Sequence, residues 1–163
     1  VNVMGFSTLL CDGSFVLDRE YDCGIIMSSE RKTEIACDYT DVDEYPYLFD
    51  LFNFVDYGNV DFESWYVDIS HRIRHGCAKA VTLNIDGGII SSAIFSSIYE
   101  NDAILTAVQT KSEFRKSGYA SALVSAMCCD VTGTVFLMRE KDKNVSFYKK
   151  LLFDNIGKWR IYK

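Results

Sequence analysis

The chain has 163 residues, 48% of them hydrophobic and 25% charged, which excludes collagen, coiled coil and intrinsic disorder and suits one compact domain. The formal net charge of −6 argues against a general nucleic-acid-binding protein. No apolar run approaches the ~20 residues that a membrane-spanning helix requires, so we expect no membrane segment.

The N-terminal part of the chain predicts a β-hairpin. Two apolar segments within Leu9–Leu17 flank Asp12-Gly13, a dipeptide that is typical of tight hairpin turns. A further strand is expected over residues 21–29. We therefore interpret residues 1–33 as a β-hairpin extension with two possible roles, a contact in a homodimer or part of an upstream domain.

The main domain is expected over residues 34–163 and begins with a strand over residues 34–40 and two helices. The first helix is expected to start near Asp43. The second has Asp61 as a favourable N-cap residue and carries apolar residues at helical spacing. Gly76 is expected to end it.

A three-stranded antiparallel meander is predicted next. Its apolar segments are separated by Gly- and Asn-containing turns and span residues 78–85, 89–99 and 103–110. A helix, a strand, a helix and a last strand are expected over residues 121–129, 135–138, 144–151 and 159–162. This order predicts an α/β (α+β) fold with a mixed, mainly antiparallel central sheet flanked by helices.

Cysteine usage and the start of the chain bear on its cellular compartment. The six cysteines include no Cys-x-x-Cys pair, which favours free thiols in the core of a cytoplasmic protein over a disulfide scaffold. The chain starts at Val1 with no charged leader, so we expect no secretory signal and a natural chain that extends upstream.

The loop between the strand that ends at Thr110 and the following helix is the most informative segment. A helix N-terminus presents free N–H groups and a partial positive charge, which together bind phosphate. Arg115 and Lys116 add positive charge, and Gly118 lacks the Cβ that would keep an anion away. The glycine spacing matches neither a nucleoside-triphosphate loop nor a dinucleotide fingerprint.

The distribution of charge agrees with an anion site near this loop. Residues 1–60 carry 12 acidic and 3 basic residues, whereas residues 111–163 carry 5 acidic and 11 basic ones. A basic end on an acidic protein suits a ligand with several phosphates.

The segment Arg115-Lys116-Ser117-Gly118-Tyr119-Ala120 resembles the Arg/Gln-x-x-Gly-x-Gly/Ala pyrophosphate loop of the GNAT superfamily of N-acetyltransferases. Residues 144–153 resemble the family's Asn…Phe-Tyr-x-Lys-Leu-Gly-Phe segment, with Leu152 in place of its Gly. The resemblance covers residues 77–163. It implies an acyl-CoA N-acyltransferase fold that uses acetyl-CoA as cosubstrate and no metal. The residues that it implies for binding CoA are Val108, Gln109, Thr110, Arg115, Lys116, Ser117, Gly118, Tyr119, Ala120 and Asn144.

The resemblance also implies a reaction. The acetyl group would move from the CoA thioester to a primary amine of a small molecule or peptide, by direct attack in a ternary complex. A backbone N–H near Thr110 would stabilise the oxyanion. The acidic first half of the chain favours a cationic acceptor. The alternative is a non-catalytic acyl-CoA-binding or sensor domain.

The residues that would carry the chemistry have plain structural alternatives. By its match to the family, Tyr148 would be the general acid near the CoA sulfur; otherwise it is a hydroxyl at the edge of the core. Asn144 is either a pantetheine contact or a helix N-cap. Glu100 is the candidate base, or an exposed turn residue. His71 and His75 have metal-ligand spacing without a partner carboxylate, so we expect a surface or substrate-side role for them.

Overall fold

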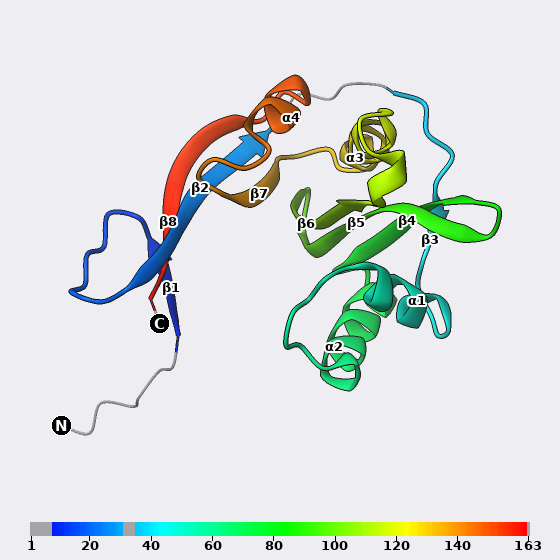
Figure 1. Ribbon diagram of the computed structural model, residues 1–163, viewed down its shortest axis with the longest axis horizontal. Coiled ribbons are helices and arrows are strands. Elements are labelled where there is room, and N and C mark those ends of the chain that lie inside the picture. The colour runs from blue at the N-terminus through cyan, green and yellow to red at the C-terminus, as the bar shows by residue number, and fades with distance from the viewer. Residues whose placement is uncertain (1–7, 31–34, 163) are drawn as a thin grey trace.

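One eight-stranded sheet runs through the computed structural model, which describes residues 8–30 and 35–162 (Figure 1). Its strand order is β1-β8-β2-β7-β6-β5-β4-β3, and only β6 and β7 pair in parallel. This confirms the predicted fold class. The strands are β1 (Leu9–Asp12), β2 (Tyr21–Ser29), β3 (Thr40–Asp41), β4 (Lys79–Ile85), β5 (Gly88–Tyr99), β6 (Asp102–Thr110), β7 (Val135–Glu140) and β8 (Asp154–Tyr162). The α-helices are α1 (Tyr47–Phe54), α2 (Phe62–Arg74), α3 (Tyr119–Cys129) and α4 (Val145–Lys150).

The predicted N-terminal hairpin is wrong. The turn forms, because the Phe15 N–H donates to the Asp12 carbonyl at 3.0 Å, but no strand follows it before β2. Strand β1 pairs instead with β8, at the far end of the sequence, with Leu9 opposite Tyr162 and Asp12 opposite Trp159. The free edge of β8 thus satisfies the backbone groups that a hairpin partner would have taken.

Strand β2 lies inside the sheet, hydrogen-bonded to β7 on one side and to β8 on the other. This part of the expected N-terminal extension is therefore an interior strand. The strand predicted over residues 34–40 reduces to the two-residue β3, while the stretch from 35 to 39 has no regular structure and residue 34 lies outside the described residues.

The two predicted helices between β3 and β4 are confirmed. Asp61 caps α2, its carboxylate accepting a hydrogen bond from the Ser64 N–H at 2.9 Å. Gly76 follows the end of α2 with a φ of +69°, a left-handed conformation that favours glycine. Helices α1 and α2 cover one face of the meander β4–β6, and α3 covers the other (Figure 1).

Each face of the sheet buries its own apolar cluster. Phe95, Leu123 and Met127 are fully buried between the sheet and α3, and Leu48 and Leu51 of α1 are fully buried on the other face. Burial of each such side chain contributes about 1.5–3 kcal/mol. The cysteines contribute less to the core than expected, since Cys128 is the only one of the six described cysteines that is buried, and none of them forms a disulfide bond.

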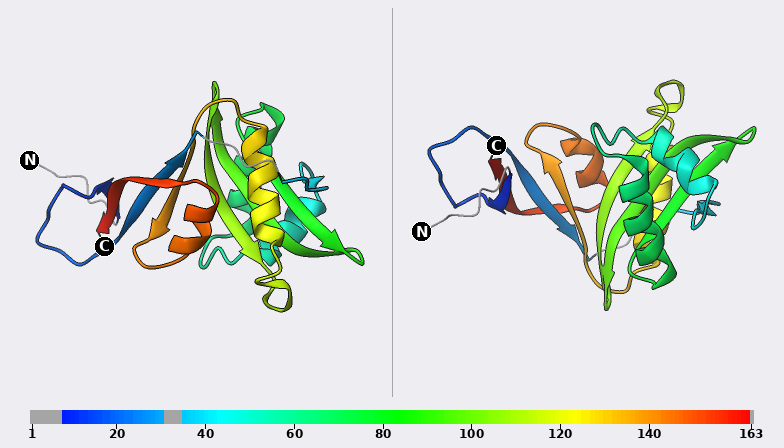
Figure 2. Two further views of the ribbon diagram at one scale, coloured as in Figure 1. Left: turned by 90° about the horizontal axis from the view of Figure 1, so that it is seen from above. Right: turned by 90° about the horizontal axis from the view of Figure 1, so that it is seen from below.

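The predicted meander is confirmed, and its last strand carries the irregularity that creates the site. Strand β6 pairs with β7 only over Ala103–Leu105. Beyond this point one extra residue is inserted into β6 opposite β5, and Ala107 there has a φ of +50°. The Ser92 hydroxyl stabilises this bulge by donating to the Ala107 carbonyl at 3.1 Å. Strands β6 and β7 then separate, and α4 lies between their diverging ends (Figure 2).

Candidate functional site

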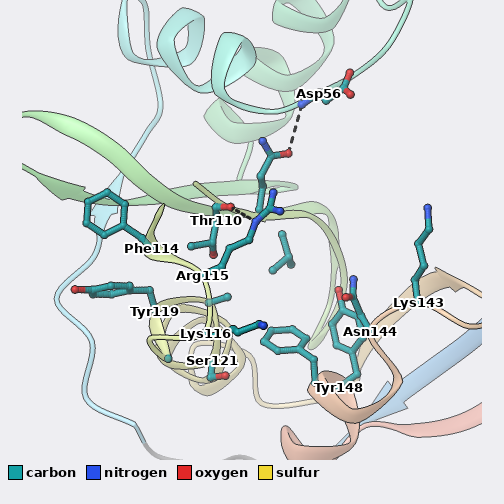
Figure 3. A pocket seen from close by; sticks show the side chains of 15 residues that line it. Asp56, Thr110, Phe114, Arg115, Lys116, Tyr119, Ser121, Lys143, Asn144 and Tyr148 are labelled. Carbon is teal, nitrogen blue, oxygen red and sulfur yellow. Dashed lines mark hydrogen bonds between the residues drawn. The ribbon is translucent and has the colours of Figure 1, made fainter. Parts of the chain in front are cut away.

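The separation of β6 from β7 opens a cavity of about 890 Å³. The end of β6 forms one wall, the loop before α3 and the start of α3 form another, and α4 with its preceding loop forms the third (Figure 3). The lining residues are Asp56, Val108, Gln109, Thr110, Phe114, Arg115, Lys116, Gly118, Tyr119, Ala120, Ser121, Lys143, Asn144, Phe147 and Tyr148. The structure thus brings together at one cavity every sequence-predicted site residue except Ser117 and Glu100.

The start of α3 presents unused donors to this cavity. Its N-cap residue Gly118 has a φ of +88°, and the first hydrogen bond within the helix runs from the Ala122 N–H to the Gly118 carbonyl at 2.9 Å. The N–H groups of the three preceding residues have no acceptor within the helix. The first turn contains no acidic residue. This helix end can therefore accept an anion.

The loop before α3 adds positive charge that protein carboxylates do not neutralise. Glu113 pairs with Lys111 at 2.9 Å, and this contact lowers the pKa of its carboxyl to about 2. Among the described residues, no carboxylate pairs with Arg115 or Lys116, and the Arg115 Nε donates only to the Thr110 carbonyl at 3.0 Å. Lys116 has a φ of +64°, which costs a non-glycine residue roughly 1–2 kcal/mol. Two cations and a helix N-terminus thus face one end of the cavity.

Helix α4 supplies the opposite wall. Asn144 occupies the N-cap position with a φ of +57°, but its side chain makes no capping hydrogen bond and lines the cavity instead. Of the two alternatives for Asn144, the N-cap position is therefore real while the side chain stays available to a ligand. Lys143 lines the cavity beside it and pairs with Glu140 at 2.8 Å.

Tyr148 reaches the cavity from the next turn of α4 and is only 9% exposed. Its ring packs edge-on against Phe147 and Phe153, which fixes its orientation. Burial raises the pKa of its phenol above the usual value of 10, and the nearby Arg139 guanidinium only partly offsets this rise. Its hydroxyl has no hydrogen-bond partner within the part of the chain that the structure describes, so it is a protonated donor available to a ligand.

The side chain of Gln109 forms hydrogen bonds within the fold that the sequence did not predict. Its side-chain Nε2 donates to the Phe54 carbonyl at 2.6 Å, and its Oε1 accepts a long hydrogen bond of 3.5 Å from the Asp56 N–H. The amide thus ties the end of β6 to the loop that follows α1. The Gln109 side chain therefore positions that loop. The part of Gln109 that a ligand in the cavity could contact is its backbone.

Glu100 does not reach the cavity. It lies exposed in the turn between β5 and β6, with a φ of +53°, whereas the cavity begins at Val108 near the other end of β6. At about 3.3 Å per residue, this separation is on the order of 25 Å. The candidate base is therefore corrected to an exposed turn residue.

His71 of α2 and His75, the C-cap residue of that helix, also lie apart from the cavity, with ring centroids 4.5 Å from each other. Within residues 8–30 and 35–162, no group of three or more His, Cys, Asp or Glu side chains could hold a metal ion. In the same part of the chain, no helix has the length and apolar character needed to cross a membrane.

Sequence reasoning missed several lining residues, chiefly Asp56, Ser121 and Lys143. Ser121 could have been predicted from the sequence, because it lies in the first turn of the helix whose N-terminus was expected to bind phosphate. Asp56 and Lys143 could not have been predicted, since both lie in loops that are brought to the cavity only when the sheet and helices pack together.

Comparisons with known proteins bear on the fold and on the part of the chain that holds the cavity. A family model described as FR47-like protein matches residues 90–161, which include the loop before α3, α3 and α4. A search of curated proteins gives no match.

Solved structures share the fold. A protein from the GNAT family of Novosphingobium aromaticivorans has 17% identity and a TM-score of 0.65, covering 95% of this chain and 66% of that one. A GCN5-related N-acetyltransferase from Kribbella flavida has 12% identity and a TM-score of 0.60, covering 94% and 60%. A predicted acetyltransferase with acetyl-CoA from Clostridium acetobutylicum has 14% identity and a TM-score of 0.52, covering 69% and 86%.

These structures confirm the predicted fold, of acyl-CoA N-acyltransferase type, and the FR47-like match covers the part of the chain that carries the GNAT resemblance. The chain spans 66% of the length of the Novosphingobium protein and 60% of that of the Kribbella protein.

Proposed function

We propose that this chain, with its acyl-CoA N-acyltransferase fold, is an acetyl-CoA-dependent N-acetyltransferase that transfers the acetyl group directly to a primary amine. The observation that carries the proposal is the combination of unpaired cations and free helix N–H groups at one end of the cavity. Arg115 and Lys116 lack carboxylate partners among the described residues, and α3 begins there with no acidic residue in its first turn. This cradle fits the diphosphate of CoA.

The remaining walls fit the rest of such a ligand. Beyond Leu105 the edge of β6 no longer pairs with β7, so a pantetheine chain has backbone groups beside it at Val108 and Thr110. Asn144 offers a side-chain amide on the facing wall.

The chain's own residues would supply the acid of the reaction. Acetyl transfer forms a bond between the amine nitrogen and the acetyl carbon and breaks the carbon–sulfur bond of the thioester. The departing sulfur needs a proton, and the amine must lose one because its ammonium form has a pKa of about 10.4. Tyr148 is protonated, oriented by two aromatic neighbours and open to the cavity, and it would donate the proton to sulfur.

Titration of CoA in a calorimeter tests the cradle. The double variant Arg115→Ala, Lys116→Ala is expected to weaken CoA binding by about 100-fold, because two charge-assisted contacts to phosphate are lost. Lys158→Ala is the matched control: this exposed lysine lies on β8, away from the cavity, and its removal should leave the affinity unchanged.

The outcomes separate the two function classes. Absence of heat with the unaltered protein would refute the proposal, and an unchanged affinity in the double variant would refute the cradle. CoA binding without acetylation of any amine would favour the alternative, a non-catalytic acyl-CoA-binding domain.

A further inference from the structure

Strand β7 carries a buried cation, Arg139, whose side chain is 7% exposed. Its Nη1 donates to the carbonyls of Glu140 and Lys141, and its Nε donates to the Met27 Sδ at 3.2 Å. Over residues 8–30 and 35–162, no carboxylate pairs with this guanidinium and its Nη2 has no acceptor. A buried charge is costly unless an opposite charge pairs with it, so this cation indicates a role other than stability.

The guanidinium of Arg139 is held between the sheet and α4, on the side of the sheet that carries Tyr148. Side chains two positions apart on a strand share a face, so Arg139 lies on the same face as Leu137. Leu137, Met27 and Tyr148 belong to one buried apolar cluster, and the Arg139 Nε contacts Met27 of this cluster. The two carbonyls that accept from Arg139 lie at the end of β7 and in the loop that leads into α4.

The charge of Arg139 acts on the Tyr148 phenol. It lowers the pKa of this phenol, against the larger rise that burial causes, and no other charged side chain of the described residues shifts it. Lys143 lines the same cavity but pairs with Glu140 at 2.8 Å. Arg139 is not among the residues that line the cavity, so its influence on a bound ligand would pass through Tyr148.

Proton donation by Tyr148 would create a negative charge close to this cation. In the proposed reaction the phenol O–H bond breaks and an S–H bond forms on the departing CoA, which leaves a phenolate. The acceptor amine releases a proton to water, and the phenolate regains one from water. In a buried site a cation stabilises such a charge more strongly than it would in bulk water. With Arg139 in place, Tyr148 is therefore a stronger acid than a phenol buried alone.

We propose that Arg139 is a positioning residue of the transferase that acts through Tyr148. Its guanidinium stabilises the phenolate that forms when Tyr148 gives its proton to the CoA sulfur, and its hydrogen bonds hold the loop that leads into α4. A guanidinium is suited to this role, because it keeps its charge at any pH at which a protein is folded. The proposal rests on the proposed acetyltransferase function and on Tyr148 as the acid.

Double-mutant kinetics test this role, because the charge of Arg139 affects the rate only while Tyr148 is present. Thiol release from acetyl-CoA is measured with the fastest acceptor among n-butylamine, 1,4-diaminobutane and glycinamide. Arg139→Met removes the charge and keeps an unbranched side chain. It is expected to lower kcat about tenfold and to leave the CoA affinity within about twofold. In the Tyr148→Phe background the same substitution should change kcat by less than about twofold.

Two further variants serve as controls. Arg139→Lys keeps the positive charge and should keep kcat within about threefold of the unaltered protein. Arg160→Met is the matched control at another site: Arg160 is a half-buried arginine of β8 whose Nη1 donates to the Phe15 carbonyl at 3.0 Å, and it does not line the cavity. Its replacement should leave kcat unchanged.

The outcomes separate this role from a structural one. An equal loss of kcat in the presence and absence of the Tyr148 hydroxyl, or an unchanged kcat in Arg139→Met, would overturn the proposal. If Arg139→Met does not fold and binds no CoA, Arg139→Lys decides: a kcat within threefold supports the role, and a tenfold loss at unaltered CoA affinity overturns it. The proposed function fails differently, since an unaltered protein that acetylates none of the three amines would overturn the transferase itself.

Discussion

Replacement of Gly24 by alanine is expected to destabilise the protein by about 3 kcal/mol, a loss of about 6–12 °C in Tm for a chain of this size. Gly24 is buried in β2, opposite Glu140 of β7 and Trp159 of β8. A Cβ at this position would collide with the Arg139 carbonyl and the Trp159 ring. The same carbonyl accepts the indole N–H of Trp159 at 3.2 Å, so the clash also breaks a buried hydrogen bond.

The matched control for Gly24 is Gly157→Ala. Gly157 lies on β8 opposite Ile26 of β2, and a Cβ there would meet only the Ile26 side chain at 3.5 Å, an ordinary contact distance. Urea unfolding should show a clear loss of stability for Gly24→Ala and a loss below about 1 kcal/mol for Gly157→Ala. Equal midpoints for the two variants would show that β2 is not packed between β7 and β8 as described.

The importance of β2 could not be read from the sequence. The existence of β2 was predictable, because residues 21–29 have the composition of a strand. Which strands it pairs with depends on contacts between residues more than 100 positions apart, and local patterns contain no information on these. The same limit explains β1, whose turn residues were identified correctly but whose partner proved to be β8.

The position of the loop before α3 was predictable because its signal is local. A strand end, two cations and Gly118 follow one another within nine residues, and the structure gathers them at one end of the cavity. Glu100, the candidate base, lies at the turn between β5 and β6, far from the cavity. In an antiparallel pair the turn lies at the start of the second strand, and the cavity forms at its end.

The residues that face this loop depend on how far β6 and β7 separate. That separation follows from the bulge at Ala107 and from parallel pairing that stops at Leu105. Neither is visible in the composition of the strands. Asp56 and Lys143 enter the site only as a consequence of this geometry.

Replacement of Tyr148 by phenylalanine is expected to lower kcat by 10²-fold or more while leaving CoA affinity and stability unchanged. The ring contacts with Phe147 and Phe153 persist in the variant, and the hydroxyl that is lost has no partner among the described residues. The loss of rate would therefore report the missing proton donor. Tyr99→Phe is the matched control, since Tyr99 is 75% exposed at the far end of the meander and should keep full activity.

The pH dependence of the reaction provides an independent test of Tyr148. Burial raises the pKa of this phenol above 10, so the proton needed by the leaving sulfur stays in place to a higher pH than on a free tyrosine. The rate should rise with pH as the acceptor amine loses its proton, with no descending limb below pH 10. Because the acid limits the rate only above that pH, Tyr148→Phe should depress the whole profile below pH 10 without shifting its ascending limb. A variant that keeps kcat within twofold of the unaltered protein would exclude Tyr148 as the general acid.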